Sequence, residues 1–221
     1  MTRLGRHLLL STLALAACRS QVQGNGELGV EQRTVAPFDA VEISLGIEAA
    51  VTANAAAQAL TLSGDSNLLP LIRTPVEAGL LRTTLHGVDG VDPINPLRLS
   101  AQAVRLQRVK AIEASIVDVN GAGSAAAGFA FTVEADERSS VSLAGPGGHE
   151  LIVKLSGGAL LDASSYPVAS ANLLLTGPSV LRLDCSGDLT GSAADKSSVT
   201  VTGGGRCDGL TLTGEATCQR K

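Results

Sequence analysis

Val117-Asp118-Val119-Asn120-Gly121 begins the stretch that decides the fold, which continues to Gly214. Apolar residues alternate with polar ones there in short runs, and each run ends at a small or turn-forming residue. Seven runs share this form: 117–121, 141–145, 153–157, 173–177, 181–185, 199–203 and 210–214. A period of two buries one face of a strand and leaves the other in water. Repetition of this unit, with almost no helical pattern between the runs, predicts an all-β solenoid of stacked strands.

The runs also predict how the coils are built. Inward Val and Leu form aliphatic columns at a strand spacing of about 4.8 Å, and outward Ser and Thr form hydroxyl ladders. Glycine at the corners permits positive φ, and two classes of corner give one coil roughly every 20 residues. Leu173-Leu174-Leu175 breaks the alternation, so we expect a second layer or a neighbouring loop to cover Leu174. An antiparallel β-sandwich shows the same alternation, and periodicity alone leaves it as the alternative fold.

The composition fits a thin aliphatic core. Aromatic residues make up 2% of the 221 residues, Trp is absent and Gly occurs 25 times. The formal net charge is -4. Nucleic-acid binding requires clustered Lys and Arg that neutralise phosphates, so we expect no nucleic-acid partner.

Residues 1–17 have the features of a secretory signal peptide. Two arginines precede an apolar run at residues 8–17, which as a helix is about 15 Å long and too short to span a bilayer. Leu15-Ala16-Ala17-Cys18 resembles a bacterial lipobox, in which the cysteine is acylated and becomes the mature N-terminus. We therefore predict an exported lipoprotein of the bacterial cell envelope, held to the membrane by lipid on Cys18. Arg19, in place of the Asp that favours inner-membrane retention, favours the outer membrane. An ordinary secretory cleavage site is the alternative.

The polar, glycine-bearing segment 18–33 is predicted to be a flexible tether, with a first irregular strand as the alternative. The β-domain then covers residues 34–221. Its first half has strand patterns at 41–45, 60–63, 80–85, 97–100 and 104–106, and a loop composition at 87–96. Between 64 and 73, Ser66 or Asn67 is expected to cap one short helical turn through Leu71, with Pro70 near its start.

Three segments carry a resemblance to a known family: Phe38–Ile43, Leu60–Leu69 and Val76–Leu81. In this order, and followed by the glycine-punctuated second half, they resemble the putative auto-transporter adhesin, head GIN domain family from about Val35 to the C-terminus. The sequence departs from the family's Ser-Gly turns at Gly145-Pro146-Gly147 and Gly177-Pro178-Ser179. This departure affects the expected local shape of those turns and leaves the expected number of strands unchanged. The resemblance implies a right-handed parallel β-helix, often lipid-anchored or exported, whose molecular function is not established.

Three cysteines remain after Cys18, and an exported chain permits disulfides. Cys185 and Cys207 lie about one coil apart, which can bring their Cα atoms within bonding reach. Cys207 and Cys218 flank one strand and can pair if the tail folds back. The pairing among Cys185, Cys207 and Cys218 stays open. No CxxC or HxxxH spacing occurs, so we predict no metal site and no cofactor.

Scattered acids offer the one enzymatic hypothesis. Asp184 and Asp188 flank the turn at 185–187 and, with Asp162, form a candidate carboxylate set for a polysaccharide-acting hydrolase on a β-helix. A sugar site generally needs aromatic platforms, and Tyr166 is the one candidate after Phe131. Asp at a turn usually bonds its own backbone, so we assign no catalytic residue.

Other polar groups point to ordinary structure. His86 and His149 lie in no nucleophile motif, and the glycine runs after strands lack the Lys-Ser/Thr pair of a phosphate loop. The basic residues at 105, 108 and 110 are interpreted as a solvated strand face. The sequence therefore predicts a non-enzymatic envelope lipoprotein that acts in adhesion, or as a scaffold that binds an envelope protein or glycan. The alternatives are the hydrolase and a structural lipoprotein without a ligand.

Overall fold

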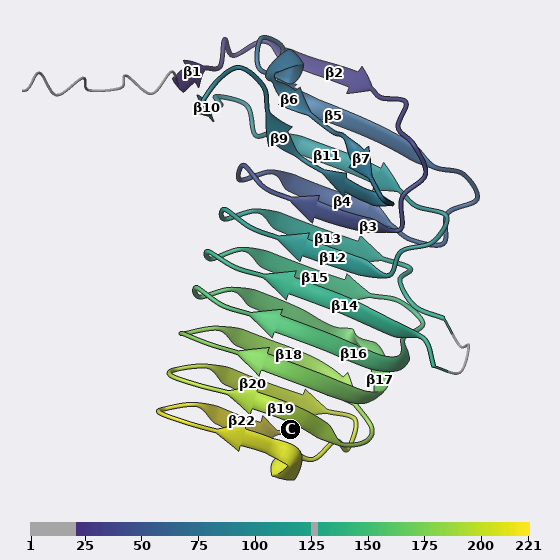
Figure 1. The fold of residues 1–221 in the computed structure, drawn as a ribbon, viewed down its shortest axis with the longest axis vertical. Helices are drawn as coiled ribbons and strands as arrows, with labels where there is room; N and C mark the ends of the chain where they lie inside the picture. Colours follow the sequence, from purple (N-terminus) through teal and green to yellow (C-terminus); the bar gives the residue numbers. More distant parts are fainter. Residues whose placement is uncertain (1–20, 125–127) are drawn as a thin grey trace, which may run out of the picture.

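The computed structural model describes residues 21–124 and 128–221, whose strands wind into a parallel β-solenoid of about six turns (Figure 1). Each turn contributes one strand to each of two stacked sheets, which face each other across the core. Neighbouring rungs pair in parallel, so the solenoid is confirmed and the antiparallel sandwich is wrong.

The first sheet follows the order β8-β3-β12-β14-β16-β17-β19-β21, with every neighbour parallel. Its strands are β8 (Leu80–Arg82), β3 (Ala40–Ile43), β12 (Arg108–Ala111), β14 (Ala130–Ala135), β16 (Gly148–Leu155), β17 (Leu160–Leu175), β19 (Leu189–Ala193) and β21 (Leu210–Leu212).

The second sheet follows the order β2-β5-β11-β4-β13-β15-β17-β18-β20-β22. Its remaining strands are β2 (Leu28–Gln32), β5 (Ala59–Asp65), β11 (Arg98–Gln102), β4 (Glu48–Thr52), β13 (Ile116–Asn120), β15 (Ser140–Ala144), β18 (Val180–Cys185), β20 (Ser198–Thr202) and β22 (Thr217–Arg220). The long strand β17 belongs to both sheets, because its first part pairs with β15 and its last part with β16.

The inter-strand register sets the length of a coil. Phe131 lies beside Leu151 and Leu151 beside Ala171, which is the predicted coil of 20 residues. The following coil is two residues shorter, since Ala171 lies beside Leu189. The coil between β12 and β14 is four residues longer than 20, because Val109 pairs with Val133. The strands therefore stack in register while the loops absorb the difference.

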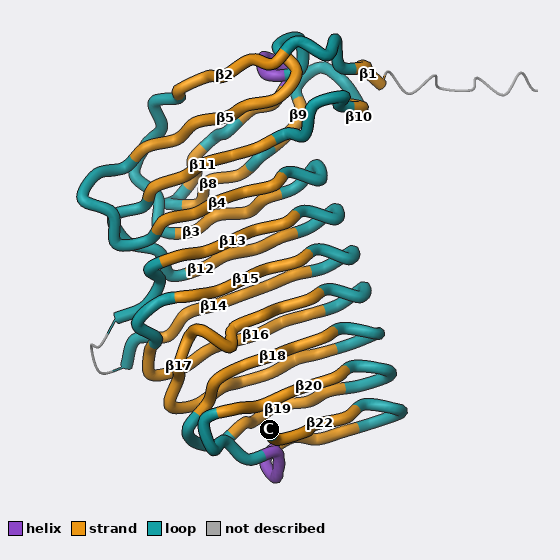
Figure 2. The backbone as a smooth tube through the Cα atoms, turned by 180° about the vertical axis from the view of Figure 1, so that it is seen from behind, coloured by secondary structure: helices purple, strands orange, loops and turns teal. Residues whose placement is uncertain are grey.

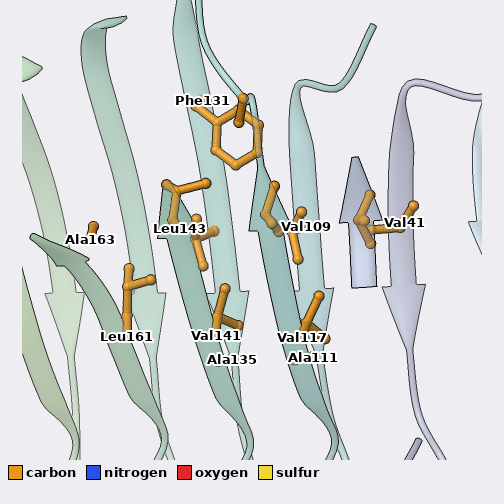
Figure 3. Packing of buried hydrophobic residues seen from close by; sticks show 14 of the residues in the cluster. Val41, Val109, Ala111, Val117, Phe131, Ala135, Val141, Leu143, Leu161 and Ala163 are labelled. Atoms are coloured by element: carbon orange, nitrogen blue, oxygen red, sulfur yellow. The ribbon is translucent and has the colours of Figure 1, made fainter. Parts of the chain in front are cut away.

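Identical positions on successive rungs form the core columns (Figure 3). The second-sheet column runs through Leu62, Leu99, Ala49, Val117, Val141, Leu161, Leu181, Val199 and Cys218. In the first sheet, Val41, Val109, Val133, Val153 and Leu173 form a matching column. These side chains are buried apart from the terminal Cys218, which is partly buried. Alternation thus places one apolar residue over another at each step, as the sequence predicts.

One class of corner is a tight two-residue turn from the first sheet to the second (Figure 2). In the turn after β12, the Ile112 carbonyl accepts a hydrogen bond from the Ser115 amide at 3.2 Å, and the same pattern recurs between Asp136 and Ser139. The middle residues have positive φ whether or not they are glycine: Glu113, Ala114, Glu137 and Arg138 adopt it alongside Gly157 and Gly158. Glycine at the corners is therefore only part of the turn chemistry. The Gly177-Pro178 corner keeps positive φ at Gly177, and the Ser179 hydroxyl donates to the Thr176 carbonyl at 2.8 Å.

A long insertion between β4 and β12 forms the N-terminal end of the solenoid (Figure 1). It contains β5, the 3-10 helix η1 (Leu69–Leu71), β6 (Ile72–Arg73), β7 (Val76–Glu77), β8, β9 (Thr84–Leu85), β10 (Gly90–Asp92) and β11. At this end β5 runs antiparallel to both β2 and β11, and β6 runs antiparallel to β9. The insertion therefore interrupts the repeat and covers the first rung.

Several local predictions are wrong. The helical turn η1 starts after Leu68 without a side-chain cap, so neither Ser66 nor Asn67 caps it, although Pro70 lies near its start as expected. The segment 104–106 is a loop, and β12 begins at Arg108 because that residue lies in register with Ala40. The segment 87–96 contains the short strand β10, which pairs with β1 (Gln21–Gln23).

Leu174 and the tether are also corrected. Leu174 is 45% exposed and no layer covers it, because Leu173 and Leu175 alone point into the core. The described part of the predicted tether, residues 21–33, contains β1 and β2, which pair with β10 and β5. For these residues the alternative of a first irregular strand is the better description. The signal segment and Cys18 lie outside the described residues.

Candidate functional surfaces

An apolar hollow on the outer side of the second sheet lies over β5, β11, β4 and β13, with a volume of about 390 Å³. Its origin is a small side chain: Ala50 lies in an outward row between Ser100 and Asp118, and its methyl group leaves a gap between them. Ile116, 47% exposed, forms one wall. Half of the lining comes from the insertion and half from the repeat.

The polar rim of this hollow can hold hydrogen-bonding ligands. The Arg98 guanidinium donates from Nε to Glu48 Oε2 at 2.9 Å across neighbouring strands. Hydroxyls of Thr61, Ser63 and Ser100 line the other side. Both members of the ion pair are well exposed, so the pair contributes little to stability. An apolar floor with a mixed-charge, hydroxyl-bearing rim suits an extended ligand such as a peptide or a glycan edge.

The outer side of the first sheet carries a row of alternating charge. Register places Arg82, Glu42, Lys110, Glu134 and Lys154 side by side on successive strands. The Lys110 ammonium lies 3.0 Å from Glu42 Oε2, and Arg82 Nε lies 3.5 Å from Glu42 Oε1. Opposite charges directly across from each other stabilise a sheet by about 0.2–1 kcal/mol per pair.

The basic cluster is thus partly neutralised. Lys110 belongs to the charge row, Arg108 is exposed on β12 and Arg105 lies in the loop before it. Arg108 and Lys110 agree with the interpretation of a solvated strand face, whereas Arg105 lies outside the strand. Hydroxyl ladders are only partly formed, because charged residues such as Asp162 and Arg182 interrupt the outward row that Ser142 and Thr200 share.

Two of the three candidate acids, Asp162 and Asp188, are engaged locally, and Asp184 lines a hollow at the longer corner of the solenoid. Asp162 accepts hydrogen bonds from the Ser164 hydroxyl at 2.6 Å and its amide at 3.1 Å, and Arg182 lies 3.6 Å away. The Ser164 hydroxyl, with Arg182, holds the pKa of the Asp162 carboxyl below its ordinary value. Asp188 accepts from Arg206 at 3.0 Å. An acid for glycoside cleavage needs a raised pKa, and the pKa of Asp162 is lowered.

A second hollow, of about 370 Å³, brings together residues that are distant in sequence. Asp184, Ser186 and His149 line it at the longer corner of the solenoid. Register explains the meeting, since Gly148 lies beside Val168 and Val168 beside Cys185. The Ser186 hydroxyl donates to the Val168 carbonyl at 3.3 Å, not to the imidazole, so no activated nucleophile is formed. His86 lies elsewhere, in a hollow of the N-terminal insertion.

The aromatic pair is structural. Phe131 and Tyr166 have no exposed surface, and their ring centroids lie 5.8 Å apart with a 53° tilt. Burial raises the pKa of Tyr166 to about 12, and none of the described residues hydrogen-bonds its hydroxyl. Tyr166 is therefore buried away from any sugar and provides no platform for one.

The three described cysteines have two roles. Cys207 and Cys218 form a disulfide with Cα atoms 6.1 Å apart. Cys218 ends the second-sheet core column, and Cys207 lies in the 3-10 helix η2 (Cys207–Gly209) just before β21. The bond therefore joins the last strand to the preceding corner and closes the last turn. Cys185 is a free, buried thiol whose pKa is raised by burial.

The described residues offer neither a metal cluster nor a membrane-spanning helix. No three or more His, Cys, Asp or Glu side chains gather there in a way that could hold a metal ion. Among residues 21–124 and 128–221, no helix has the length and apolar character needed to cross a membrane.

Comparison with known proteins gives the family. Residues 37–205 match the model of the family described as "Putative auto-transporter adhesin, head GIN domain". The chain belongs to this family. The match covers the whole insertion and the solenoid from β3 to β20, and it confirms the resemblance noted in the sequence. None of the curated proteins compared with the chain matches it.

Solved structures with the same fold come from Bacteroides and Parabacteroides species. A putative adhesin from Bacteroides fragilis is similar with a TM-score of 0.67 and 12% identity, over 90% of this chain and 99% of that one. A putative lipid binding protein from Parabacteroides distasonis has a TM-score of 0.61 and 11% identity, over 91% and 100%. A putative adhesin from Parabacteroides merdae has a TM-score of 0.52 and 16% identity, over 91% and 99%. At these identities the similarity establishes the fold.

Proposed function

We propose that this family member is a non-enzymatic binding module of the bacterial cell envelope, anchored at the outer membrane by lipid on Cys18. It binds an envelope protein or a glycan along its exposed strand faces. The observation that carries the proposal is the hollow over β5, β11, β4 and β13, with its apolar floor and its rim of hydroxyl and charged groups. The adhesin family supports a surface role.

The geometry of the acids favours binding over catalysis. Asp162 is held by Ser164 and Arg182, and Asp188 by Arg206. The aromatic side chains that a glycosidase would use to hold a sugar are buried in the core. The fold class is therefore the only observation that supports the hypothesis of a polysaccharide-acting hydrolase.

The test is an array of glycans and envelope proteins probed with the mature protein, run beside an assay for released reducing sugar. Ala50→Phe fills the hollow and is expected to abolish the strongest binding signal. Ser142→Phe is the matched control, since residue 142 occupies the same outward row two strands away from Ala50. Binding that survives Ala50→Phe would refute the hollow as the site, and sugar release would refute the non-enzymatic role.

Anchoring is tested separately. Acylation of Cys18 is expected to appear in the mass of the mature protein and in its flotation with outer-membrane vesicles. Cys18→Ser is expected to remove both, and a wild-type protein that lacks acyl groups would refute the anchor.

A further inference from the structure

The N-terminal end of the solenoid fixes the place where the chain leaves the fold. Strand β1 pairs with β10, and the Asn67 side chain donates to the Gln23 carbonyl at 2.8 Å. Cys18 precedes Gln21 by three residues, which span at most about 10 Å when extended. A lipid on Cys18 therefore holds this end of the molecule close to the membrane (Figure 1).

The three most exposed large apolar side chains of the described residues lie at this same end. Leu28 is 69% exposed, Val30 65% and Ile94 60%. Leu28 and Val30 share the outer face of β2. Leu28 lies opposite Asp65, whose carboxylate accepts a hydrogen bond from the Ile94 amide at 2.7 Å. The three side chains are called here the apolar rim; Leu28 and Ile94 belong to segments that meet at Asp65, and Val30 lies on the same strand as Leu28.

The buried carboxylate makes the rim a built feature. Asp65 has no exposed surface and accepts hydrogen bonds from the amides of Gly26, Ile94 and Asn95 and from the Asn95 side chain, at 2.7–3.1 Å. These bonds tie the segments before β2 and after β10 to the end of β5. Exposed apolar patches mark protein or membrane interaction sites, and the hydrogen bonds to Asp65 hold the segments that carry Leu28 and Ile94 in place.

Strand β2 also has an open edge, because among the described strands it pairs with β5 alone. Unpaired backbone groups need polar partners and are not tolerated in hydrocarbon. Lipid headgroups and interfacial water supply such partners while apolar side chains reach the acyl boundary. The edge and the rim together therefore fit the interfacial layer of a bilayer.

We propose that the apolar rim of Leu28, Val30 and Ile94 lies in the headgroup region of the membrane that the lipidated chain is anchored to. This inference rests on the proposed acylation of Cys18. The rim adds a second contact to the lipid anchor and orients the solenoid, so that β21, β22 and their disulfide form the end distant from the membrane.

The natural absence of Trp makes the test direct. Val30→Trp, in the full acylated protein bound to phosphatidylcholine vesicles with brominated acyl chains, is expected to show a blue-shifted emission and strong quenching. Leu174→Trp, on the first sheet, and Leu212→Trp, at the far end, are the controls, being 45% and 41% exposed. Both are expected to keep the emission that they have without vesicles. Circular dichroism and the thermal midpoint establish that each variant folds.

The outcomes separate the two proposals. If the wild type floats with vesicles no better than Cys18→Ser, the anchor fails, and the rim inference fails with it. If the protein floats but Val30→Trp is quenched no more than Leu174→Trp, the rim inference alone is overturned. A blue shift of Val30→Trp without vesicles that grows with protein concentration, together with dimers in sedimentation, would assign the rim to a second copy and also overturn it.

Discussion

Leu173 and Leu174 are adjacent and chemically identical, yet the structure gives them opposite environments. Leu173 is 1% exposed and lies in the first-sheet core column, while Leu174 is 45% exposed on the outer face. Leu173→Ala is therefore expected to destabilise the fold strongly and Leu174→Ala only weakly. The pair tests the register of β17 with its neighbours, because a slip of one residue would exchange the two environments.

The magnitude follows from what surrounds Leu173. Substitution of a buried Leu by Ala costs about 2–5 kcal/mol, from lost transfer free energy and the cavity that remains. In its column Leu173 lies between Val153 and Gly191, and Gly191 has no side chain to lose contact with. We therefore expect about 3 kcal/mol for Leu173→Ala, in the lower half of the range. An exposed substitution of this kind costs about 0.5 kcal/mol.

The assay is urea unfolding followed by circular dichroism. With a slope of about 3 kcal/mol per M for a chain of this length, the Leu173→Ala midpoint is expected about 1 M lower than the wild type. The Leu174→Ala midpoint is expected to remain close to the wild type. Equal losses in the two variants, or a larger loss for Leu174→Ala, would refute the register and with it the assignment of β17 to the first sheet.

Three further predictions concern single features. Replacing Cys207 and Cys218 by Ser is expected to cost about 3 kcal/mol in urea unfolding, from the freed 11-residue loop, and an unchanged midpoint would refute the closing role of the bond. Burial alone would raise the pKa of Asp65, but its hydrogen bonds outweigh it and lower the pKa below 3.8. The stabilisation by Asp65 is therefore complete above pH 3.8 and lost as the pH falls below it, so the urea midpoint should fall more steeply with acid in the wild type than in Asp65→Asn. Tyr166→Phe removes a hydroxyl without a protein partner and should leave thermal stability unchanged or raised, whereas Tyr166→Ala should lower it by about 4 kcal/mol.

The second half of the fold could be predicted from the sequence because its alternation of apolar and polar residues is repeated from coil to coil. Each inward position, such as Val141 or Leu181, stacks on an apolar residue one coil away. Each alternating run therefore strengthens the prediction made from the next. The failure at Leu174 has a simple origin: a run of three leucines does not reveal which ones face inward, and only the neighbouring rung decides. The corners at 113–114 and 137–138 were missed because non-glycine residues adopt positive φ there.

The first half was harder because its pairing is not local. Strand β4 has the sequence Glu48–Thr52, whose two adjacent alanines carry almost no alternating signal. Its partners β11 and β13 lie about 50 and 68 positions further along the chain. The disulfide pairing could not be predicted from the sequence for a related reason. The sequence spacing of Cys185 and Cys207 suits a disulfide bridge. In the structure, however, Cys185 is fully enclosed in the core, whereas Cys218 ends a core column at the open end of the solenoid.

The candidate site lies where the repeat is broken, and this has a physical reason. A solenoid of identical rungs presents rows of outward side chains of similar length, so a rung of different composition favours an apolar hollow on a strand face. The insertion supplies one by placing β5 and β11 beside β4, where Ala50 interrupts a row of longer side chains. The same insertion holds the Asp65 carboxylate that fixes the apolar rim one strand away. The distinctive chemistry of this chain is therefore concentrated at its N-terminal end, while the later coils extend the core and carry it away from the point of attachment.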